Sequence, residues 1–405
     1  MPLYLIAVNP TDSVTDGFLP AAGALGLEVT VLTNQPAEHR AAYAGHPAPP
    51  DHVIGCDVHD FREIIGQLSR LPPPDAIFSN SDHLQTQTAL TAEYFGLPGK
   101  NWPAAVRTKN KAQMRRHLAA HDGDLPVVWS AELPAEADPA VLVRDELPYP
   151  CVVKPREGVA SEDVVLVADA VELVLRCREI QTRRPGAALV VEEFVAGQLH
   201  TLETLGDGKN LWVLGGFRTA VSAPPYFIEE NMVFDPQPPA AQVDSVLAQL
   251  AALGVGFGAC HTEYVLDAGG QARLVEVNYR VVGDQCDLLL ADLFGYPLFE
   301  RVLRVHLGEP LPGEWQPRPD ARARIDYVCA DASGTLVSAP EAGNWLRDNG
   351  IRVTYRPVRE LGARRDKTNT NRDYLGMLRI TGADQAAVDA AAAEFLATRR
   401  WEIQA

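Results

Sequence analysis

Two acids, an amide and a histidine share one segment, "HTEYVLDAGGQARLVEVNYR" (residues 261–280). Its alternation predicts a hairpin with residues 268–271 as the loop, which sets Glu263 opposite Glu276 and His261 opposite Asn278. Facing carboxylates on antiparallel strands lie about 5 Å apart and repel each other. Two carboxylates beside an amide offer the oxygen ligands that Mg²⁺ prefers, completed by water and phosphate. The alternative is a solvated hairpin face whose charges point into water.

The other face of the same segment is apolar. Val275, Val277 and Tyr279 alternate with the polar residues, so we expect them to point into a core.

Two lysines have positions that could serve phosphate binding. Lys154 ends the apolar strand "CVVKP", directly before the loop "REGVAS", so its ammonium could reach a phosphate while the loop amides cover other oxygens. Lys111 lies early in the stretch 103–122, which predicts one helix. Either side chain could equally be an ordinary surface lysine.

The first hundred residues alternate strands and helices, and this order predicts parallel strands joined by right-handed crossovers. Ligands of such sheets bind at the carboxyl ends of strands. The loops "NPTD" (9–12) and "SNSD" (79–82) are therefore candidate ligand loops, although polar loops after strands are common without function. Neither GxGxxG nor GxxxxGK[ST] occurs, which removes the main support for a dinucleotide fingerprint or a P-loop.

Further elements are expected along the rest of the chain. Strands are predicted in 149–167 and 188–197, a hairpin around "GDGK", a loop over 222–239, and helices over 240–253, 284–294, 297–307 and 383–399. The Pro-rich stretch 308–321 marks a boundary before a last small α/β unit. The expected domains are residues 1–102, 103–200, 201–310 and 311–405.

Composition excludes several classes of partner. The net charge is −17, with 53 acids against 36 bases and no basic stripe, which argues against nucleic acid. The six cysteines occur singly without CxxC spacing, as expected for reduced thiols rather than disulfides or a zinc site. No window approaches the 18 or so apolar residues that a membrane span needs, so a soluble, cytoplasmic protein is expected.

Five motifs in this order resemble the ATP-grasp superfamily. They are the N-terminal α/β region, the lysine-bearing helix, "VVKP" with its Gly-containing loop, the "VVEEFVAG" hinge and "HTEY…EVNYR". The resemblance implies an α/β (α+β) ATP-grasp fold: an N-terminal open parallel sheet, a central domain, a metal-binding lobe and a small C-terminal α/β unit.

The resemblance also implies site roles. Lys111, Lys154 and Ser161 would bind ATP phosphates; Glu192 and Val195 would meet the adenine edge through their backbone, with Glu193 and Phe194 shaping the hinge; Glu263, Glu276 and Asn278 would hold Mg²⁺, with Mn²⁺ as an alternative. Arg280 would stabilise the transferring phosphoryl group, which makes Arg280 and Asn278 the implied catalytic residues.

Two departures from the superfamily pattern affect ATP binding. The acid that often contacts the ribose, two residues after the hinge Gly197, is replaced by Leu199. The loop "REGVASEDV" carries Glu157, Glu162 and Asp163, which puts its phosphate contacts in doubt.

The continuation "VNYRVVGDQ" separates branches of the superfamily. Biotin carboxylase usually runs into a Val-Glu-His triplet, so the sequence is more similar to the amino-acid and dipeptide ligases, including ligases of siderophore or other specialised-metabolite pathways. Arg218 could pair with a substrate carboxylate or with a surface acid, and His261 could touch substrate or be structural.

The resemblance implies an ATP- and Mg²⁺-dependent carboxylate–amine ligase that works through an acyl phosphate and releases ADP and phosphate. Its partners would be a small carboxylate and a small amine, with a homodimer as the oligomer suggested by analogy. The alternatives are a carboxylase-like enzyme with a non-amine nucleophile and a nucleotide-binding protein without turnover.

Overall fold

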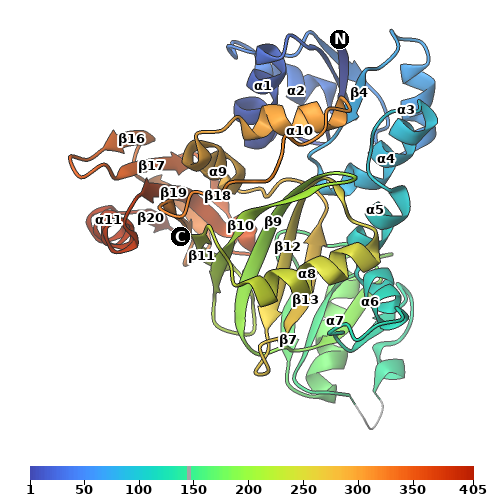
Figure 1. Ribbon diagram of the computed structural model, residues 1–405. Coiled ribbons are helices and arrows are strands. Elements are labelled where there is room, and N and C mark those ends of the chain that lie inside the picture. The colour runs from blue at the N-terminus through green and yellow to red at the C-terminus, as the bar shows by residue number, and fades with distance from the viewer. Residues whose placement is uncertain (144–146) are drawn as a thin grey trace.

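The computed structural model describes residues 1–143 and 147–405, with the N-terminal unit at the top of Figure 1. Four strands there pair in parallel in the order β3-β2-β1-β4. Leu3 and Leu5 pack into one core while Tyr4 and Ile6 pack into another, so helices cover both faces of this sheet. The elements are β1 Pro2–Ile6, η1 Ser13–Phe18, α1 Leu19–Ala24, β2 Glu28–Thr33, α2 Pro36–Tyr43, β3 His52–Gly55, α3 Phe61–Leu68, β4 Ala76–Phe78, η2 Asp82–Leu84 and α4 Gln85–Tyr94.

Two helices, α5 (Trp102–Lys109) and α6 (Lys111–Ala119), occupy the stretch predicted as one helix, so that prediction was wrong. Asn110 between them has an extended backbone, and its side chain accepts a hydrogen bond from the backbone N–H of Gln113. This is an N-cap, and it makes Lys111 the first residue of α6.

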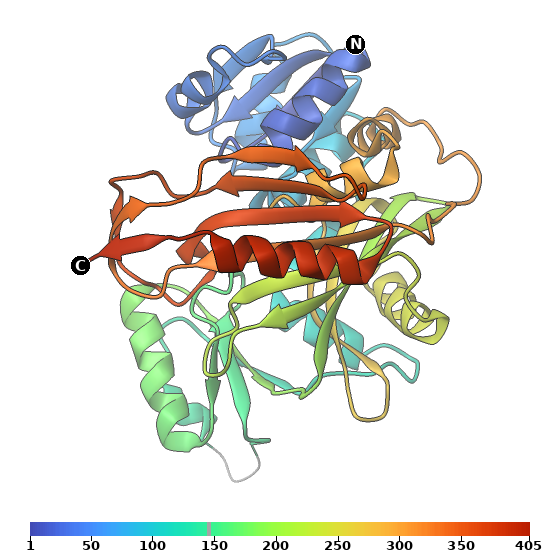
Figure 2. The ribbon, with the colours of Figure 1, turned by 90° about the vertical axis from the view of Figure 1, so that its left-hand side faces the viewer.

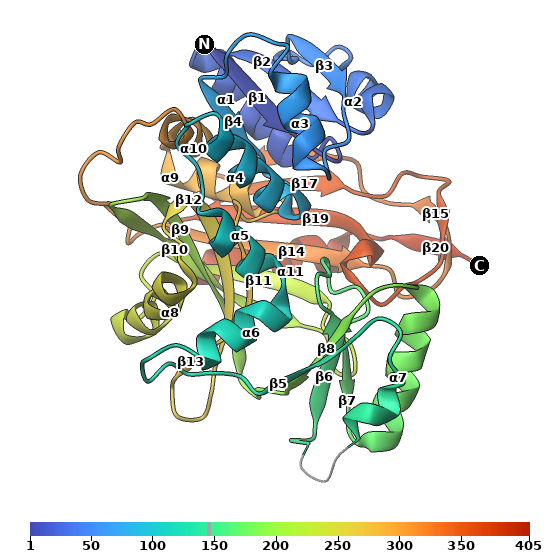
Figure 3. The same ribbon diagram turned by 90° about the vertical axis from the view of Figure 1, so that its right-hand side faces the viewer.

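A second sheet lies at the opposite end of the molecule from the N-terminal unit (Figure 3). Its strands are antiparallel in the order β5-β8-β6-β7, and α7 packs on it through Leu173, Cys177 and Ile180. The elements are β5 Ser130–Leu133, η3 Pro139–Leu142, β6 Cys151–Pro155, β7 Val165–Val167, α7 Ala170–Arg183 and β8 Leu189–Glu193.

The largest sheet has nine strands in the order β13-β12-β9-β10-β11-β14-β19-β17-β16. Helix α8 covers the β13 end, while α9 and α10 pack on the core shared with the N-terminal unit. The elements are β9 Gln198–Asp207, β10 Leu211–Val221, β11 Glu229–Asp235, α8 Ala240–Leu253, β12 Phe257–Leu266, β13 Ala272–Asn278, α9 Cys286–Phe294, α10 Leu298–His306, β14 Arg322–Cys329, β16 Gly343–Leu346, β17 Arg352–Pro357 and β19 Tyr374–Gly382.

The C-terminal part continues this sheet. Figure 2 shows α11 (Gln385–Thr398), in red, lying along the C-terminal strands, and its apolar face packs in one core with Tyr355, Leu378 and Ile380. A small sheet, β18-β15-β20, completes the chain with β15 Gly334–Ser338, β18 Arg364–Arg365, η4 Asn371–Asp373 and β20 Glu402–Gln404. Because β14 pairs with β11, the sheet runs through the boundary expected near residue 310, and the proposed domain limits stay a prediction.

The loop expected over residues 222–239 was wrong in its second half, which forms β11. Met232 and Phe234 are buried while their neighbours are less so, and this alternation is the signal that was missed.

All six cysteines are free, as expected. Among the described residues, no helix has both the length and the apolar character needed to cross a bilayer.

Candidate active site

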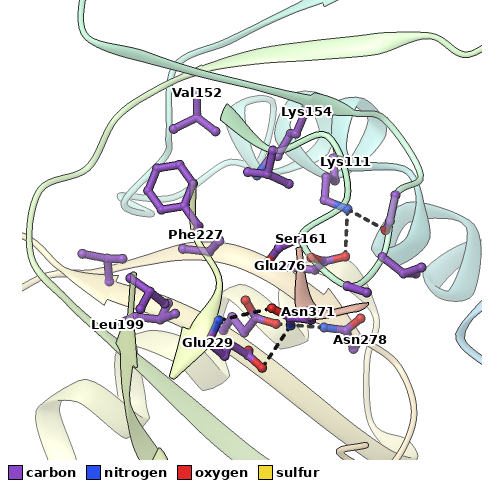
Figure 4. A pocket seen from close by; sticks show the side chains of 18 of the residues that line it. Lys111, Val152, Lys154, Ser161, Leu199, Phe227, Glu229, Glu276, Asn278 and Asn371 are labelled. Carbon is purple, nitrogen blue, oxygen red and sulfur yellow. Dashed lines mark hydrogen bonds and ion pairs between the residues drawn. The ribbon is translucent and has the colours of Figure 1, made fainter. Parts of the chain in front are cut away.

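A cavity of about 470 Å³ lies where the β6–β8 part of the four-stranded sheet faces the β12–β13 end of the large sheet. Figure 4 shows its side chains converging from both sheets, with Lys111 and Lys154 above Glu276 and Asn278. The cavity lining includes every candidate residue but one: Lys111, Lys154, Ser161, Glu192, Glu193, Phe194, Val195, His261, Glu263, Glu276, Asn278 and Arg280. The exception is Arg218, which is exposed on β10 and gains no support as a substrate residue.

The hairpin pairs Glu263 with Glu276 and His261 with Asn278, as predicted. The predicted loop 268–271 was one residue short, because Leu266 pairs with Ala272 and Asp267 belongs to the loop. A β-bulge next to Tyr264 makes up the difference.

The bulge also changes which side chains enter the core. Leu274, Val277 and Tyr279 are buried there, whereas Val275 lines the cavity, so the expectation for Val275 was wrong.

The carboxylates of the hairpin are sheltered rather than solvated, so the alternative of a water-facing hairpin is wrong. The side chains of Glu263 and Glu276 are 18% and 21% exposed, and Asn278 is 5% exposed. Asn278 Nδ2 donates to Glu263 Oε1 at 3.3 Å. Among the described residues, no set of three His, Cys, Asp or Glu side chains could hold a metal ion by itself. Two carboxylates and an amide fit a hard cation that takes its remaining ligands from phosphate and water.

Lys111 is 3% exposed, which excludes the surface-lysine alternative. Its Nζ lies 2.8 Å from Glu276 Oε1 and donates to the carbonyl of Gly158 at 3.3 Å (Figure 4). Burial alone would lower the pKa of Lys111, but the Glu276 carboxylate outweighs it and raises the pKa. The ammonium is therefore charged and lies between a metal-ligand candidate and the loop that follows Lys154.

Lys154 is also buried, at 5% exposed, and its Nζ lies 2.7 Å from Glu192 Oε2. Arg115 holds the same carboxylate with two hydrogen bonds of 2.9 Å and donates to the carbonyls of Leu274 and Val275. Burial opposes ionisation of Glu192, yet Arg115 and Lys154 outweigh it and lower the pKa of that carboxyl to about 2. This buried charge network connects α6, β6, β8 and β13 at the wall of the cavity.

The acids of the loop after Lys154 are occupied by arginines. Arg184 pairs with both Glu162 and Asp163, Arg183 Nη2 lies 2.7 Å from Asp163, and Arg372 Nε lies 2.9 Å from Glu162. Arg156 Nη2 lies 3.2 Å from the third acid, Glu157. Each carboxylate that put the phosphate contacts in doubt therefore has an arginine partner, while Ser161 lines the cavity.

The backbone of the hinge leaves the amide of Val195, which lines the cavity, without an acceptor among the described residues. The N–H groups of Glu193 and Phe194 donate to the carbonyls of Trp129 and Pro150. For the Val195 N–H, no hydrogen-bond acceptor exists within residues 1–143 and 147–405, so it can serve a ligand edge. Leu199 adds an apolar side chain to the wall (Figure 4).

Arg280 follows β13 and lines the cavity. Within the described chain no carboxylate pairs with it, and Nη1 donates to the carbonyl of Val281 at 2.9 Å. The two candidate ligand loops of the N-terminal sheet hold the segment that follows. Asn80 Oδ1 accepts from the Val281 N–H, and Gln285 Nε2 donates to Asp12, but neither loop lines the cavity.

His261 lies between two carboxylates. Its Nδ1 is 2.7 Å from Glu203 Oε1, and its Nε2 is 3.5 Å from Glu263 Oε1. Burial would lower the pKa of His261, but Glu203 first and Glu263 second raise it to about 10. The cationic imidazole of His261 therefore lies beside Glu263 and partly offsets the negative charge of its carboxylate.

Several cavity residues were missed from the sequence: Arg115, Glu229, Asp284 and Asn371. Arg115 follows Lys111 by four residues on one helix face, a spacing that could have revealed it. Glu229 was hidden in the segment read as a loop. Burial first, and then Glu263 and Asp284, raise the pKa of Glu229 to about 8.

No family model matches the chain. An uncharacterized protein, y4rH of Sinorhizobium fredii, is 28% identical over 344 residues, which span 82% of this chain and 69% of that protein. The ATP-grasp enzyme fsqD of Aspergillus fumigatus is 27% identical over 201 residues, which span 47% of this chain but only 32% of the fungal enzyme.

Solved structures match over nearly the whole chain. An L-amino acid ligase from Bacillus licheniformis has a TM-score of 0.79 at 22% identity, covering 100% of this chain and 99% of the ligase. The biotin carboxylase domain of Hydrogenobacter thermophilus 2-oxoglutarate carboxylase has a TM-score of 0.71 at 16% identity, covering 99% and 90%. N5-carboxyaminoimidazole synthetase from Staphylococcus aureus, complexed with ADP, has a TM-score of 0.68 at 14% identity, covering 98% and 96%. The chain is therefore a protein with the ATP-grasp fold.

Proposed function

We propose that the protein is an ATP- and Mg²⁺-dependent ligase that joins a small carboxylate to an amine through an acyl phosphate. The observation that carries this proposal is the common cavity of Lys111, Lys154, Arg280, Glu263, Glu276 and Asn278. Phosphoryl transfer requires cations around the moving group and metal ligands beside it, and this set supplies both.

The first step is transfer of the γ-phosphoryl group of ATP to the substrate carboxylate. A carboxylate oxygen forms a bond to phosphorus, the bond from phosphorus to the bridging oxygen breaks, and ADP leaves with the electron pair. Lys111 and Lys154 orient the phosphates, and the unpaired guanidinium of Arg280 stabilises the charge that develops on the transferring group. Mg²⁺, held by Glu263, Glu276 and Asn278, would supply further charge neutralisation.

The second step is attack by the amine on the acyl carbon. The C–N bond forms, the C–O bond to phosphate breaks, inorganic phosphate leaves, and the nitrogen loses a proton to solvent. No side-chain nucleophile is needed, because orientation and charge neutralisation lower the barrier.

A screen of acid–amine pairs tests this proposal. Purified protein is incubated with ATP, Mg²⁺ and each pair, ADP release is recorded, and products are identified by mass spectrometry. The expected result is ADP and phosphate in equal amounts with one stable amide. A carboxylated product without an amide would instead identify a non-amine nucleophile, and calorimetric ATP binding without ADP release from any pair would identify a binding protein.

A further inference from the structure

One wall of the cavity is built by a residue far along the chain from the motifs. Asn371 lies in the loop of residues 368–373, next to β19, and its side chain points at Glu229 in Figure 4. Its Oδ1 accepts from the backbone N–H of Glu229 at 3.2 Å, and its Nδ2 donates to Glu229 Oε2 at 3.3 Å. Asn371 thus fixes both the backbone and the carboxylate of Glu229.

The loop that carries Asn371 is held in one shape by Asp373, which is 1% exposed. The Asp373 carboxylate accepts from the N–H of Asn369 at 2.6 Å and from both the N–H and the hydroxyl of Thr368 at 2.9 Å. The N–H of Asn371 donates to the carbonyl of Ala160, in the loop after Lys154, at 3.1 Å. The position of Asn371 is therefore set by its own loop, through Asp373, and by the loop after Lys154, through Ala160.

The charge of this wall differs from that of the phosphate side. Glu229 and Asp284 line it, and within the described residues neither is paired with a lysine or arginine. The cationic residues Lys111, Lys154 and Arg280 suit phosphates and a carboxylate. An amine carries N–H donors, which suit the carboxyl oxygens of this wall.

Resting on the proposed ligase function, we infer that Asn371 is a positioning residue that holds Glu229 as the hydrogen-bond acceptor for the amine substrate. The proposal assigns Glu229 to the amine alone, so a change at Asn371 is expected to affect the amine and not ATP or the carboxylate.

Steady-state kinetics of Asn371→Ala test the assignment. With a productive pair from the screen, we expect the KM for the amine to rise about tenfold, the effect of losing one well-placed hydrogen bond. The KM values for ATP and for the carboxylate are expected to change less than about twofold. Asn344→Ala, which removes an exposed asparagine of β16, is the matched control with unchanged constants. Equal increases in all three KM values, or no change in the amine KM, would overturn the proposal.

A second variant and a second readout keep the test independent of folding and of the substrate screen. Glu229→Gln should raise the amine KM as well, and the double variant should be less impaired than the product of the single effects, because the two residues act as a pair. Hydrogen exchange of the peptide 226–232 should be faster in Asn371→Ala than in the parent. If no pair yields ADP, the ligase proposal fails, and unchanged exchange in that peptide would overturn the positioning role separately.

Discussion

Lys111 Nζ and Glu276 Oε1 lie 2.8 Å apart across the cavity and join the first residue of α6 to β13, the strand that carries the proposed metal ligands Glu276 and Asn278. Phosphate and Mg²⁺ would each take one member of this pair as its own partner. Binding of the nucleotide and the metal would therefore replace this ion pair by a contact of Lys111 with phosphate and a contact of Glu276 with Mg²⁺.

Glu276→Gln should reduce substrate-dependent ADP release by about a hundredfold or more, because the variant loses a charged metal ligand and the partner of Lys111. The amide keeps the shape of the side chain, but it leaves the buried Lys111 ammonium without its carboxylate partner, so the melting temperature should fall by several degrees while unfolding stays cooperative. Coupled ADP assays and thermal melts measure the two quantities. Glu136→Gln, at an exposed glutamate, is the control, and full turnover by Glu276→Gln would contradict the metal assignment.

Arg115→Met should lower the free energy of unfolding by about 3 kcal/mol, since it leaves the buried Glu192 carboxylate with Lys154 as its one remaining cationic partner. Urea denaturation provides the measurement. The neighbouring Arg116 pairs with Glu132 at the surface, so Arg116→Met should cost about 1 kcal/mol or less. Equal losses of unfolding free energy in the two variants would show that the buried network stabilises the fold no more than the surface ion pair does.

Lys100 should make a contribution to stability that rises with pH above neutrality, opposite in sign to the contributions of His261 and Glu229. Burial lowers the pKa of this lysine from 10.5 to about 7. Between these two values the unfolded chain binds more protons at this site than the folded chain, so the contribution of Lys100 to the free energy of unfolding increases with pH, by up to about 1.4 kcal/mol per pH unit.

Urea titrations at several pH values between 7 and 10 check the contribution of Lys100. Lys100→Met should remove that part of the slope, whereas Lys209→Met, at an exposed lysine, should leave it unchanged. Parallel slopes in the parent and in Lys100→Met would disprove the assignment.

Arg184→Gln should loosen the loop after Lys154, because Arg184 pairs with Glu162 and Asp163. We expect faster hydrogen exchange in residues 156–165 and a several-fold higher KM for ATP, with little change in melting temperature. Arg178→Gln removes an exposed ion pair of the same helix and serves as the reference. An unchanged exchange rate in Arg184→Gln would mean that other contacts hold the loop.

Local patterns in the sequence were sufficient to predict the pairing of strands in the hairpin of residues 261–280. The alternation of polar and apolar residues over 261–280 indicates which positions face each other, and the predicted pairing of Glu263 with Glu276 is confirmed. The bulge near Tyr264 did not follow, because a bulge depends on packing against strands distant in sequence.

The break between α5 and α6 had a local signal, an asparagine suited to capping, that the helical composition of the stretch masked. Asn371 had no comparable signal. Its partner Glu229 lies 142 positions earlier, and no motif surrounds it, so only the tertiary structure brings the two together.

The Asp373 clamp has a practical consequence for changing this protein. The backbone of the loop 368–373 is shaped by Asp373, Thr368 and Thr370, and Arg372 holds Glu162 of the neighbouring loop. Among the described residues, the Asn371 side chain makes no hydrogen bond within that clamp. Asn369 has a left-handed backbone with a φ of 56°, which most side chains disfavour. Substitutions restricted to position 371 can therefore alter the chemistry offered to an incoming molecule while the supporting loop stays the same, which makes this position a natural starting point for redirecting the protein to new building blocks.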